Sequence, residues 1–202
     1  MIVDYPPDAI EVTQFRRKIY TDDLGLSALL VSSYRYANRR TEDKFAHWFS
    51  DEKFLHNGFD RVLIYYHGGV AVGMCGGTHY NSSLYRCVQM YYILKSARRV
   101  PGLNTLHFRE NGFFDWQLAR AKSLGVDAAF ISVDTFDQKH VNMFDAMRGN
   151  RTGFGQMSNA VRKYTADDLV YLDNTYNIMH TMQRVCYYPL VDNVDFDKCI
   201  NQ

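Results

Sequence analysis

The sequence predicts a single α/β domain, residues 1–202, in which helices pack on a mixed, mostly antiparallel sheet. Strand-like runs separated by turns follow one another between residues 61 and 95. A turn, a helical pattern and a short apolar strand come next in that order, which is typical of a parallel strand pair. Of the 202 residues, 47% are apolar and 4 are proline, which suits one compact core rather than two.

Two amphipathic helices are expected in residues 11–49, before the first of these strands. Apolar side chains recur there at helical spacing, and Thr41 or Glu42 is placed to open the second helix. The members of the first apolar stripe are Leu24, Leu26, Leu29, Leu30 and Tyr34. We interpret this stripe as core, and Trp48 as a packing anchor.

Three antiparallel strands are expected next, over residues 61–66, 70–80 and 85–95. Gly68 and Gly69 favour a tight turn between the first two strands. Asn81, Ser82 and Ser83 favour a turn before the third strand.

A helix beginning at Asn104 or Thr105 and ending at Gly125 is expected after the third strand. Trp116 is interpreted as a packing anchor of this helix. A strand over Ala128–Val133 is expected to pair in parallel with the strand before the turn. A helix over 137–148 and two strands, 168–172 and 177–190, complete the predicted order.

Charge and cysteine content exclude several classes of function. The formal net charge is +1, from 23 basic and 22 acidic side chains, which gives no general attraction to nucleic acid. No apolar run is long enough to span a membrane, and no export signal begins the sequence, so a cytoplasmic protein is expected. The four cysteines lack metal-ligand spacing, so reduced thiols and no metal site are expected.

The turn ahead of the predicted helix has the residues of an anion site. A helix start leaves backbone N–H groups unbonded, and their partial positive charge favours phosphate oxygens. Gly102 lets the backbone approach a ligand closely, Pro101 stiffens the turn, and Arg98 and Arg99 add guanidinium donors. The phosphate-loop pattern G-x-x-x-x-G-K-S/T is absent, and a solvated connector is the alternative interpretation.

With these elements in this order, the sequence resembles the GCN5-related N-acetyltransferases (GNAT) over residues 61–147. Arg99 to Asn104 matches the family's acetyl-CoA pattern, Gln/Arg-x-x-Gly-x-Gly/Ala, except at its last position. The resemblance implies helices on both faces of the sheet and acetyl-CoA as co-substrate. The acetyl-CoA-binding residues that it implies are Leu94, Ser96, Arg99, Val100, Pro101, Gly102, Leu103, Asn104, Thr105, Asp137 and His140.

The resemblance also implies a reaction, the attack of an amine on the thioester of acetyl-CoA. Backbone N–H groups of the fourth strand of the family sheet would polarise the carbonyl, and the separation of the fourth and fifth strands would hold the pantetheine arm. Phe144 stands where the family often has a tyrosine that protonates the leaving thiolate. His79 and Tyr80 are the nearest proton-handling side chains, while Tyr91 and Tyr92 adjoin the expected thioester. We assign no catalytic residue.

Two functions follow from the resemblance. The first is an N-acetyltransferase that acts on a small-molecule or peptide amine, as a monomer or homodimer. The second is a catalytically impaired module that keeps the fold and binds coenzyme A or a protein partner. Phe144, Asn104 and the absence of acidic residues from Tyr85 to Lys95 favour the second.

Overall fold

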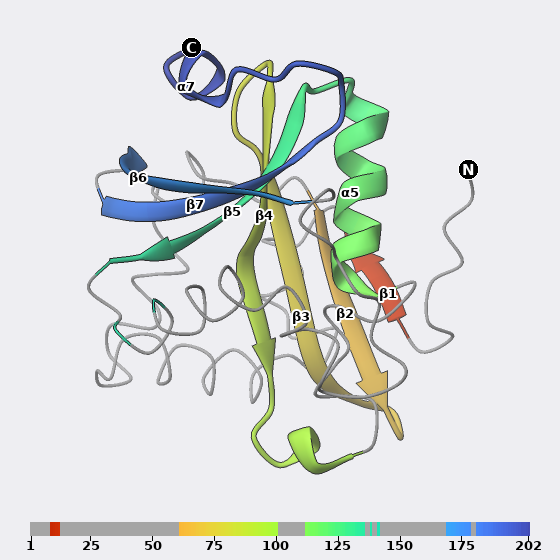
Figure 1. The fold of residues 1–202 in the computed structure, drawn as a ribbon. Helices are drawn as coiled ribbons and strands as arrows, with labels where there is room; N and C mark the ends of the chain where they lie inside the picture. The colour runs from red at the N-terminus through yellow and green to blue at the C-terminus, as the bar shows by residue number, and fades with distance from the viewer. Residues whose placement is uncertain are drawn as a thin grey trace.

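The computed structural model describes residues 9–12, 61–100, 112–135, 138, 141, 169–178 and 181–202. They form a seven-stranded sheet in the order β1-β2-β3-β4-β5-β7-β6 (Figure 1). The strands are β1 (Ala9–Val12), β2 (Arg61–His67), β3 (Val70–His79), β4 (Leu84–Ile93), β5 (Ala128–Asp134), β6 (Val170–Ile178) and β7 (Thr181–Pro189). The helical elements are η1 (Ala97–Arg99), α5 (Phe113–Leu124) and α7 (Phe196–Ile200).

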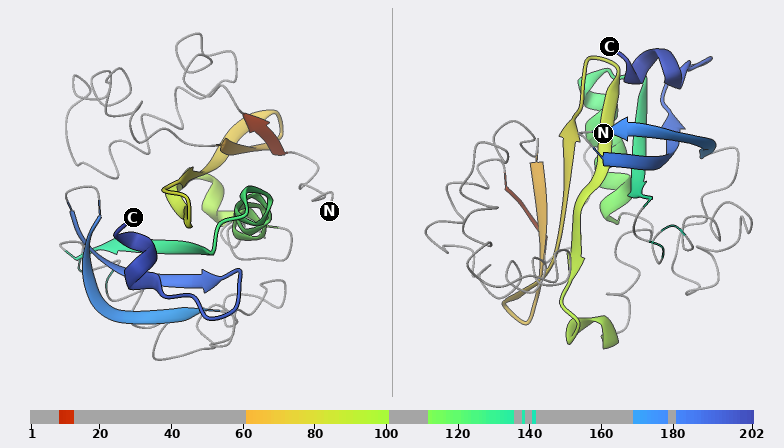
Figure 2. Two further views of the ribbon diagram at one scale, coloured as in Figure 1. Left: turned by 90° about the horizontal axis from the view of Figure 1, so that it is seen from above. Right: turned by 90° about the vertical axis from the view of Figure 1, so that its left-hand side faces the viewer.

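The predicted mixed, mostly antiparallel sheet is confirmed. All strand pairs are antiparallel except β4 with β5, which are parallel as predicted. Figure 2 shows the long strands β3 and β4 in the middle, with β1 and β2 on one side and β5, β7 and β6 on the other. The two helices predicted in residues 11–49 and the helix over 137–148 lie outside the described residues, apart from isolated positions.

The two predicted turns between the first three long strands are confirmed. Gly68 and Gly69 have φ values of 58° and 77°, the left-handed region that a two-residue hairpin turn requires. At the next turn, the Asn81 side-chain oxygen accepts hydrogen bonds from the backbone N–H groups of Ser83 at 3.0 Å and Leu84 at 2.8 Å. This side chain therefore closes the turn that leads into β4.

Helix α5 ends where the sequence predicts and begins later. Gly125 follows it in the left-handed conformation, with φ 70° and ψ 24°, and donates its N–H to the Lys122 carbonyl. The start predicted at Asn104 or Thr105 is wrong for this helix, because Gly112 is its N-cap, in an extended conformation. Gly112 therefore lies at the start of α5 and not in the middle of it.

Two strands, β1 and β6, differ from the prediction. No strand is predicted from the sequence at Ala9–Val12, yet β1 pairs with β2 there. A break is also predicted between residues 172 and 177, whereas β6 continues to Ile178 and turns only before Thr181. A register shift between Tyr171 and Thr175 takes up the polar residues that resemble a turn in the sequence.

Helix α7, in the C-terminal segment, is not predicted from the sequence. The Asp195 side chain caps α7 by accepting from the Lys198 N–H at 3.1 Å. The Phe196 ring stacks on Tyr187, with centroids 5.0 Å apart, and meets the edge of Phe130 at 5.8 Å. Ser82 and Ser83 each donate to the Gln202 side chain at 3.0 Å, which ties the last residue to the turn before β4.

Helices α5 and α7 pack against opposite faces of the sheet. Along β5, Ala129 and Ile131 join the core cluster of α5, while Ala128 and Phe130 join that of Phe196. Successive side chains of a strand point to opposite faces, so this alternation assigns every neighbouring position to a face. The expectation of helices on both faces is confirmed.

Candidate functional site

The ladder between β4 and β5 is short. It consists of the pairs Leu84–Ala128, Tyr85–Ala129 and Arg86–Phe130, although β4 has 10 residues. β5 stays paired with β7 along its whole length, and β4 stays paired with β3 up to Ile93. We call the pair Arg86–Phe130 the divergence point. Beyond it the two central strands follow different neighbours and separate (Figure 1).

A bulge in β4 explains why the strands separate at this position. Gly76 of β3 pairs with Met90, and Thr78 pairs with Arg86. Between these two pairs β3 advances by two residues and β4 by four, so β4 has two extra residues there. A bulge bends its strand and increases the local twist. Because this bulge follows Arg86 directly, it turns the rest of β4 away from β5.

Gly77 allows the close packing on which this geometry depends. A Cβ atom placed on Gly77 would lie 2.5 Å from the Tyr85 hydroxyl oxygen and 2.6 Å from a ring carbon. Real Cβ contacts are not that short, so the ring of Tyr85 lies against the β3 backbone only because residue 77 is glycine. Tyr85 itself is fully buried.

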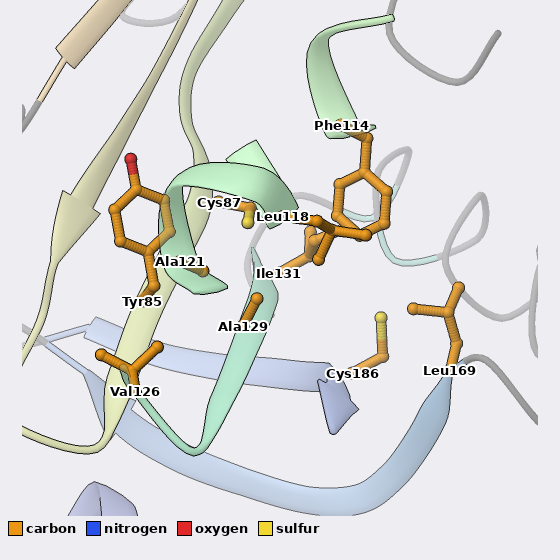
Figure 3. Packing of buried hydrophobic residues seen from close by; sticks show 10 residues of the cluster. All are labelled: Tyr85, Cys87, Phe114, Leu118, Ala121, Val126, Ala129, Ile131, Leu169 and Cys186. Atoms are coloured by element: carbon orange, nitrogen blue, oxygen red, sulfur yellow. The ribbon is translucent and has the colours of Figure 1, made fainter. Parts of the chain in front are cut away.

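The side of the divergence point facing α5 is apolar. Phe114 and Leu118 of α5, Cys87 of β4 and Ile131 of β5 belong to one buried cluster (Figure 3). In Figure 3 these side chains, on three different elements, point toward one another. A ligand lying between β4 and β5 would therefore contact an apolar layer on this side.

The opposite side of the divergence point has a polar contact beside the apolar cluster of Phe196. The Arg86 guanidinium donates from Nη2 to the Gln183 side-chain oxygen at 3.0 Å, from β4 across β5 to β7. Burial lowers the pKa of Arg86 to about 10, and nearby Tyr80 opposes part of this change. Even so, the guanidinium is cationic at neutral pH. The Tyr80 ring meets Phe130 edge-on, with centroids 5.4 Å apart.

Four of the predicted acetyl-CoA residues lie in the described part of the chain, at the end of β4 and in η1. Leu94 and Val100 are half-buried and pack against the core cluster of Phe113 and Trp116, whereas Ser96 and Arg99 are exposed. The Leu94 N–H donates to the Val72 carbonyl at 2.9 Å, which holds the segment on the sheet. None of these contacts tests acetyl-CoA binding, so the assignments stay predictions.

The remaining predicted residues lie outside the described residues. They are Pro101, Gly102, Leu103, Asn104, Thr105, Asp137 and His140. The same holds for Phe144, and the side chains of Tyr91 and Tyr92 are not described. His79 is exposed at the end of β3, and its proposed proton-handling role stays a prediction.

A second Arg-x-x-Gly spacing, outside the predicted site residues, lies directly before α5. Arg109 and Gly112 repeat the spacing of Arg99 and Gly102, ten residues further along the chain. Gly112 is the N-cap of α5 and supplies no side-chain cap, and the first helical bond runs from the Trp116 N–H to the Gly112 carbonyl at 3.1 Å. The repeated spacing was visible in the sequence, but nothing there showed that the helix starts at the second copy.

Trp116 is 3% exposed and packs with Phe113, so its predicted role as an anchor is confirmed. All four cysteines are free and buried. Burial raises the pKa of the Cys186 thiol to about 12, and those of Cys75 and Cys87 well above their usual value. These three thiols are therefore protonated at neutral pH and unsuited to nucleophilic attack.

Within the described ranges, no group of three or more His, Cys, Asp or Glu side chains could hold a metal ion. The helices of these ranges include none long and apolar enough to cross a membrane.

Comparison with solved structures identifies the fold. No family model and no curated protein sequence matches the chain. An aminoglycoside 6'-N-acetyltransferase complexed with coenzyme A superposes with a TM-score of 0.50 at 10% identity, covering 93% of this chain and 99% of that one. A GCN5-related N-acetyltransferase from Rhodopseudomonas palustris has a TM-score of 0.46 at 15% identity, covering 94% and 99%. A GNAT-family acetyltransferase from Staphylococcus aureus has 0.46 at 14%, covering 91% and 98%. The chain has the GNAT fold, as the resemblance predicted.

Proposed function

We propose that this protein is an N-acetyltransferase that transfers the acetyl group of acetyl-CoA to a primary amine. The observation on which the proposal depends is the divergence point, where β4 leaves β5 after three ladder pairs. The fold supports it, because a solved structure with the same fold is complexed with coenzyme A.

The backbone beyond the divergence point suits the pantetheine arm of acetyl-CoA. The strand ladder gives the β5-facing peptide groups of β4 no β5 partner after Arg86, within the described residues. Buried peptide groups need hydrogen-bond partners, and the two amide groups of a pantetheine arm supply both donors and acceptors. The apolar layer of Phe114, Leu118 and Ile131 would contact the methylene groups of the arm.

We place the diphosphate at the N-terminus of α5, at the Gly112 turn. This is the helix that packs beside the divergence point, and its first N–H groups, on Phe113, Phe114 and Asp115, precede the first helical hydrogen bond. Such groups favour phosphate oxygens, and Gly112 adds no Cβ atom beside them. The turn from Arg99 to Thr105 is the alternative position, and Arg99 is exposed and available to an anion in either case.

The reaction forms a bond between the amine nitrogen and the acetyl carbon and breaks the bond between that carbon and the thioester sulfur. One proton leaves the amine, and one is taken up by the departing thiolate. Backbone N–H groups of β4 after the bulge are fixed before charge develops on the carbonyl oxygen, so they are suited to stabilise it.

A non-catalytic module that binds coenzyme A is the second candidate. Phe144 favours it, because a phenyl ring cannot donate a proton to the leaving thiolate. Both candidates require coenzyme A binding, so only an assay of turnover separates them.

The test has two stages. Calorimetric titration of the protein with acetyl-CoA should show saturable binding, and a flat titration would refute both candidates. Release of free thiol in the presence of peptides, polyamines and aminoglycosides should then be measured. Thiol release that depends on an amine supports the enzyme, and binding without release across all three classes supports the module.

Two glycine variants test the placement of the diphosphate. Gly112→Val should weaken acetyl-CoA binding more than Gly102→Val does, since the added side chain would block the approach to the first N–H groups of α5. Thermal unfolding should be recorded for both variants as a control for folding. The reverse order of effects would move the diphosphate to the Arg99–Thr105 turn and leave the proposed function intact.

A further inference from the structure

Two halves of the sheet meet at the short ladder between β4 and β5. One half contains β1 to β4, and the other contains β5, β7 and β6. Beyond the ladder, β4 continues from Cys87 to Ile93, about 20 Å at the usual rise per residue, whereas the ladder itself spans about 7 Å. A rotation of about 5° at the ladder therefore moves the far end of β4 by about 2 Å relative to β5.

A second link joins the two halves beside the ladder, through the segment that contains α7. The Asn81 side-chain nitrogen donates to the Cys199 carbonyl at 2.8 Å, and the hydroxyl groups of Ser82 and Ser83 donate to the Gln202 side-chain oxygen at 3.0 Å. We call these residues the C-terminal clamp. Figure 1 shows α7 beside the turn between β3 and β4, at the end of the sheet where β4 and β5 begin.

The clamp acts on the first residues of the ladder through Ser83. The Ser83 carbonyl accepts hydrogen bonds from the N–H groups of Asp127 at 2.8 Å and Ala128 at 3.1 Å, which lie at the start of β5. Its hydroxyl group donates to Gln202, and the residue is buried. Ser83 therefore connects the turn before β4, the start of β5 and the C-terminal segment.

Helix α7 is anchored on the half that contains β5, β7 and β6. The Phe196 ring packs on one ring from each of these strands: Phe130, Tyr187 and Tyr176. The Tyr176 hydroxyl also donates to the Asp197 side chain at 2.6 Å. Because these contacts fix α7 to one half, the clamp bonds to the β3–β4 turn connect it to the other half.

We infer that the C-terminal clamp is a positioning element of the coenzyme A site, which holds the two halves of the sheet at the angle at which acetyl-CoA fits between β4 and β5. The inference rests on the proposed function, because acetyl-CoA is the ligand placed there. Three parallel pairs fix this angle weakly, since parallel pairing is less stable per residue than antiparallel pairing. A protein whose binding-competent conformation is only partly populated binds its ligand more weakly in proportion. Loss of the clamp should therefore raise the Kd for acetyl-CoA.

Calorimetry with acetyl-CoA on clamp variants of the full chain tests the inference. Gln202→Ala removes the acceptor of both serine hydroxyl groups. Asn81→Asp removes the donor to Cys199, while its carboxylate still accepts the backbone bonds that close the turn. Each variant should raise the Kd by about three- to fivefold at a temperature at which it is fully folded. Gln202→Glu keeps an acceptor oxygen and should bind acetyl-CoA like the wild-type protein.

Ile64→Val is the matched control, because Ile64 is fully buried on β2, two strands away from the ladder. Loss of one methyl group there should lower Tm and leave the Kd unchanged. A clamp that served stability alone would behave in the same way. Amide hydrogen exchange of the ligand-free protein gives a second readout: the N–H groups of Asp127 and Ala128 should exchange about threefold faster or more in Gln202→Ala, relative to those of β2.

The outcomes separate this inference from the proposed function. Wild-type affinity for acetyl-CoA in both Gln202→Ala and Asn81→Asp overturns the inference and leaves the proposed function standing. A Kd that rises as much in Ile64→Val as in the clamp variants also overturns it, as does unchanged exchange at Asp127 and Ala128 in Gln202→Ala. If the wild-type protein binds no acetyl-CoA at all, both proposals fail together.

Discussion

Replacing Gly77 with alanine tests whether close packing of β3 on Tyr85 sets the shape of the site. The new Cβ would meet the Tyr85 hydroxyl oxygen at 2.5 Å and two ring carbons at 2.6 and 2.8 Å, which are all shorter than real contacts. Tyr85 is fully buried in the cluster beneath α5, so the ring has little room to move. Overpacking of this kind destabilises a core by about 2 kcal/mol. In a domain of this length that lowers Tm by about 4–8 °C.

The assay is thermal and urea unfolding of Gly77→Ala, Tyr85→Leu and the double variant. Tyr85→Leu removes the ring that the new methyl group would strike, so Gly77→Ala should be less destabilising in that background by about 1 kcal/mol or more. An equal effect of Gly77→Ala in both backgrounds would refute the clash. Displacement of Tyr85, one residue before Arg86, should also weaken acetyl-CoA binding, which calorimetry on the folded variant measures.

Three further predictions concern stability. Gly125→Ala should destabilise the protein by about 1 kcal/mol, measured by urea unfolding, because φ 70° is unfavourable for a residue with a Cβ. Asp195→Ala should cost about 1 kcal/mol, and Asp195→Asn much less, since the amide oxygen keeps the capping bond to the Lys198 N–H. Burial raises the pKa of Cys186 from its ordinary value of 9.0 to about 12, so the stability that its protonated thiol contributes is complete below pH 9 and is lost as pH rises from 9 towards 12. Urea midpoints should therefore fall over this range, and less steeply for Cys186→Ala; equal slopes would contradict the assignment.

Local sequence predicted the elements whose cause is local. The β2–β3 turn followed from Gly68 and Gly69, which adopt positive φ more readily than other residues. The end of α5 followed from Gly125 for the same reason. β1 is not predictable in this way, because a four-residue strand is stable only through its pairing with β2, fifty or more residues along the chain. In β6, the polar residues near Asn174 resemble a turn, but pairing with β7 absorbs them in a register shift.

The candidate site was predictable only in part. The order of strand, turn, helix and parallel strand identified β4 and β5 as the central pair. The predicted start of α5, at Asn104 or Thr105, lies about two helical turns before the observed start at Phe113. The apolar periodicity does not show which of the two Arg-x-x-Gly sequences, Arg99–Gly102 or Arg109–Gly112, precedes the helix. The hydrogen bond between Arg86 and Gln183 could not be predicted, since it joins residues 97 positions apart and depends on the register of three strands.

The bulge and the short ladder have one structural origin. Until Arg86, β4 has partners on both sides, and its side chains alternate regularly between the α5 face and the α7 face. The bulge then lets β4 stay with β3 and leave β5, which gives up backbone hydrogen bonds that a regular sheet would form. Such a loss of backbone hydrogen bonds is tolerated where another group, such as a ligand, forms hydrogen bonds with the same peptide groups. Arg86 forms the last pair before the strands separate, so the peptide groups of β4 that lose their β5 partners follow directly after it, where we propose that the pantetheine arm binds.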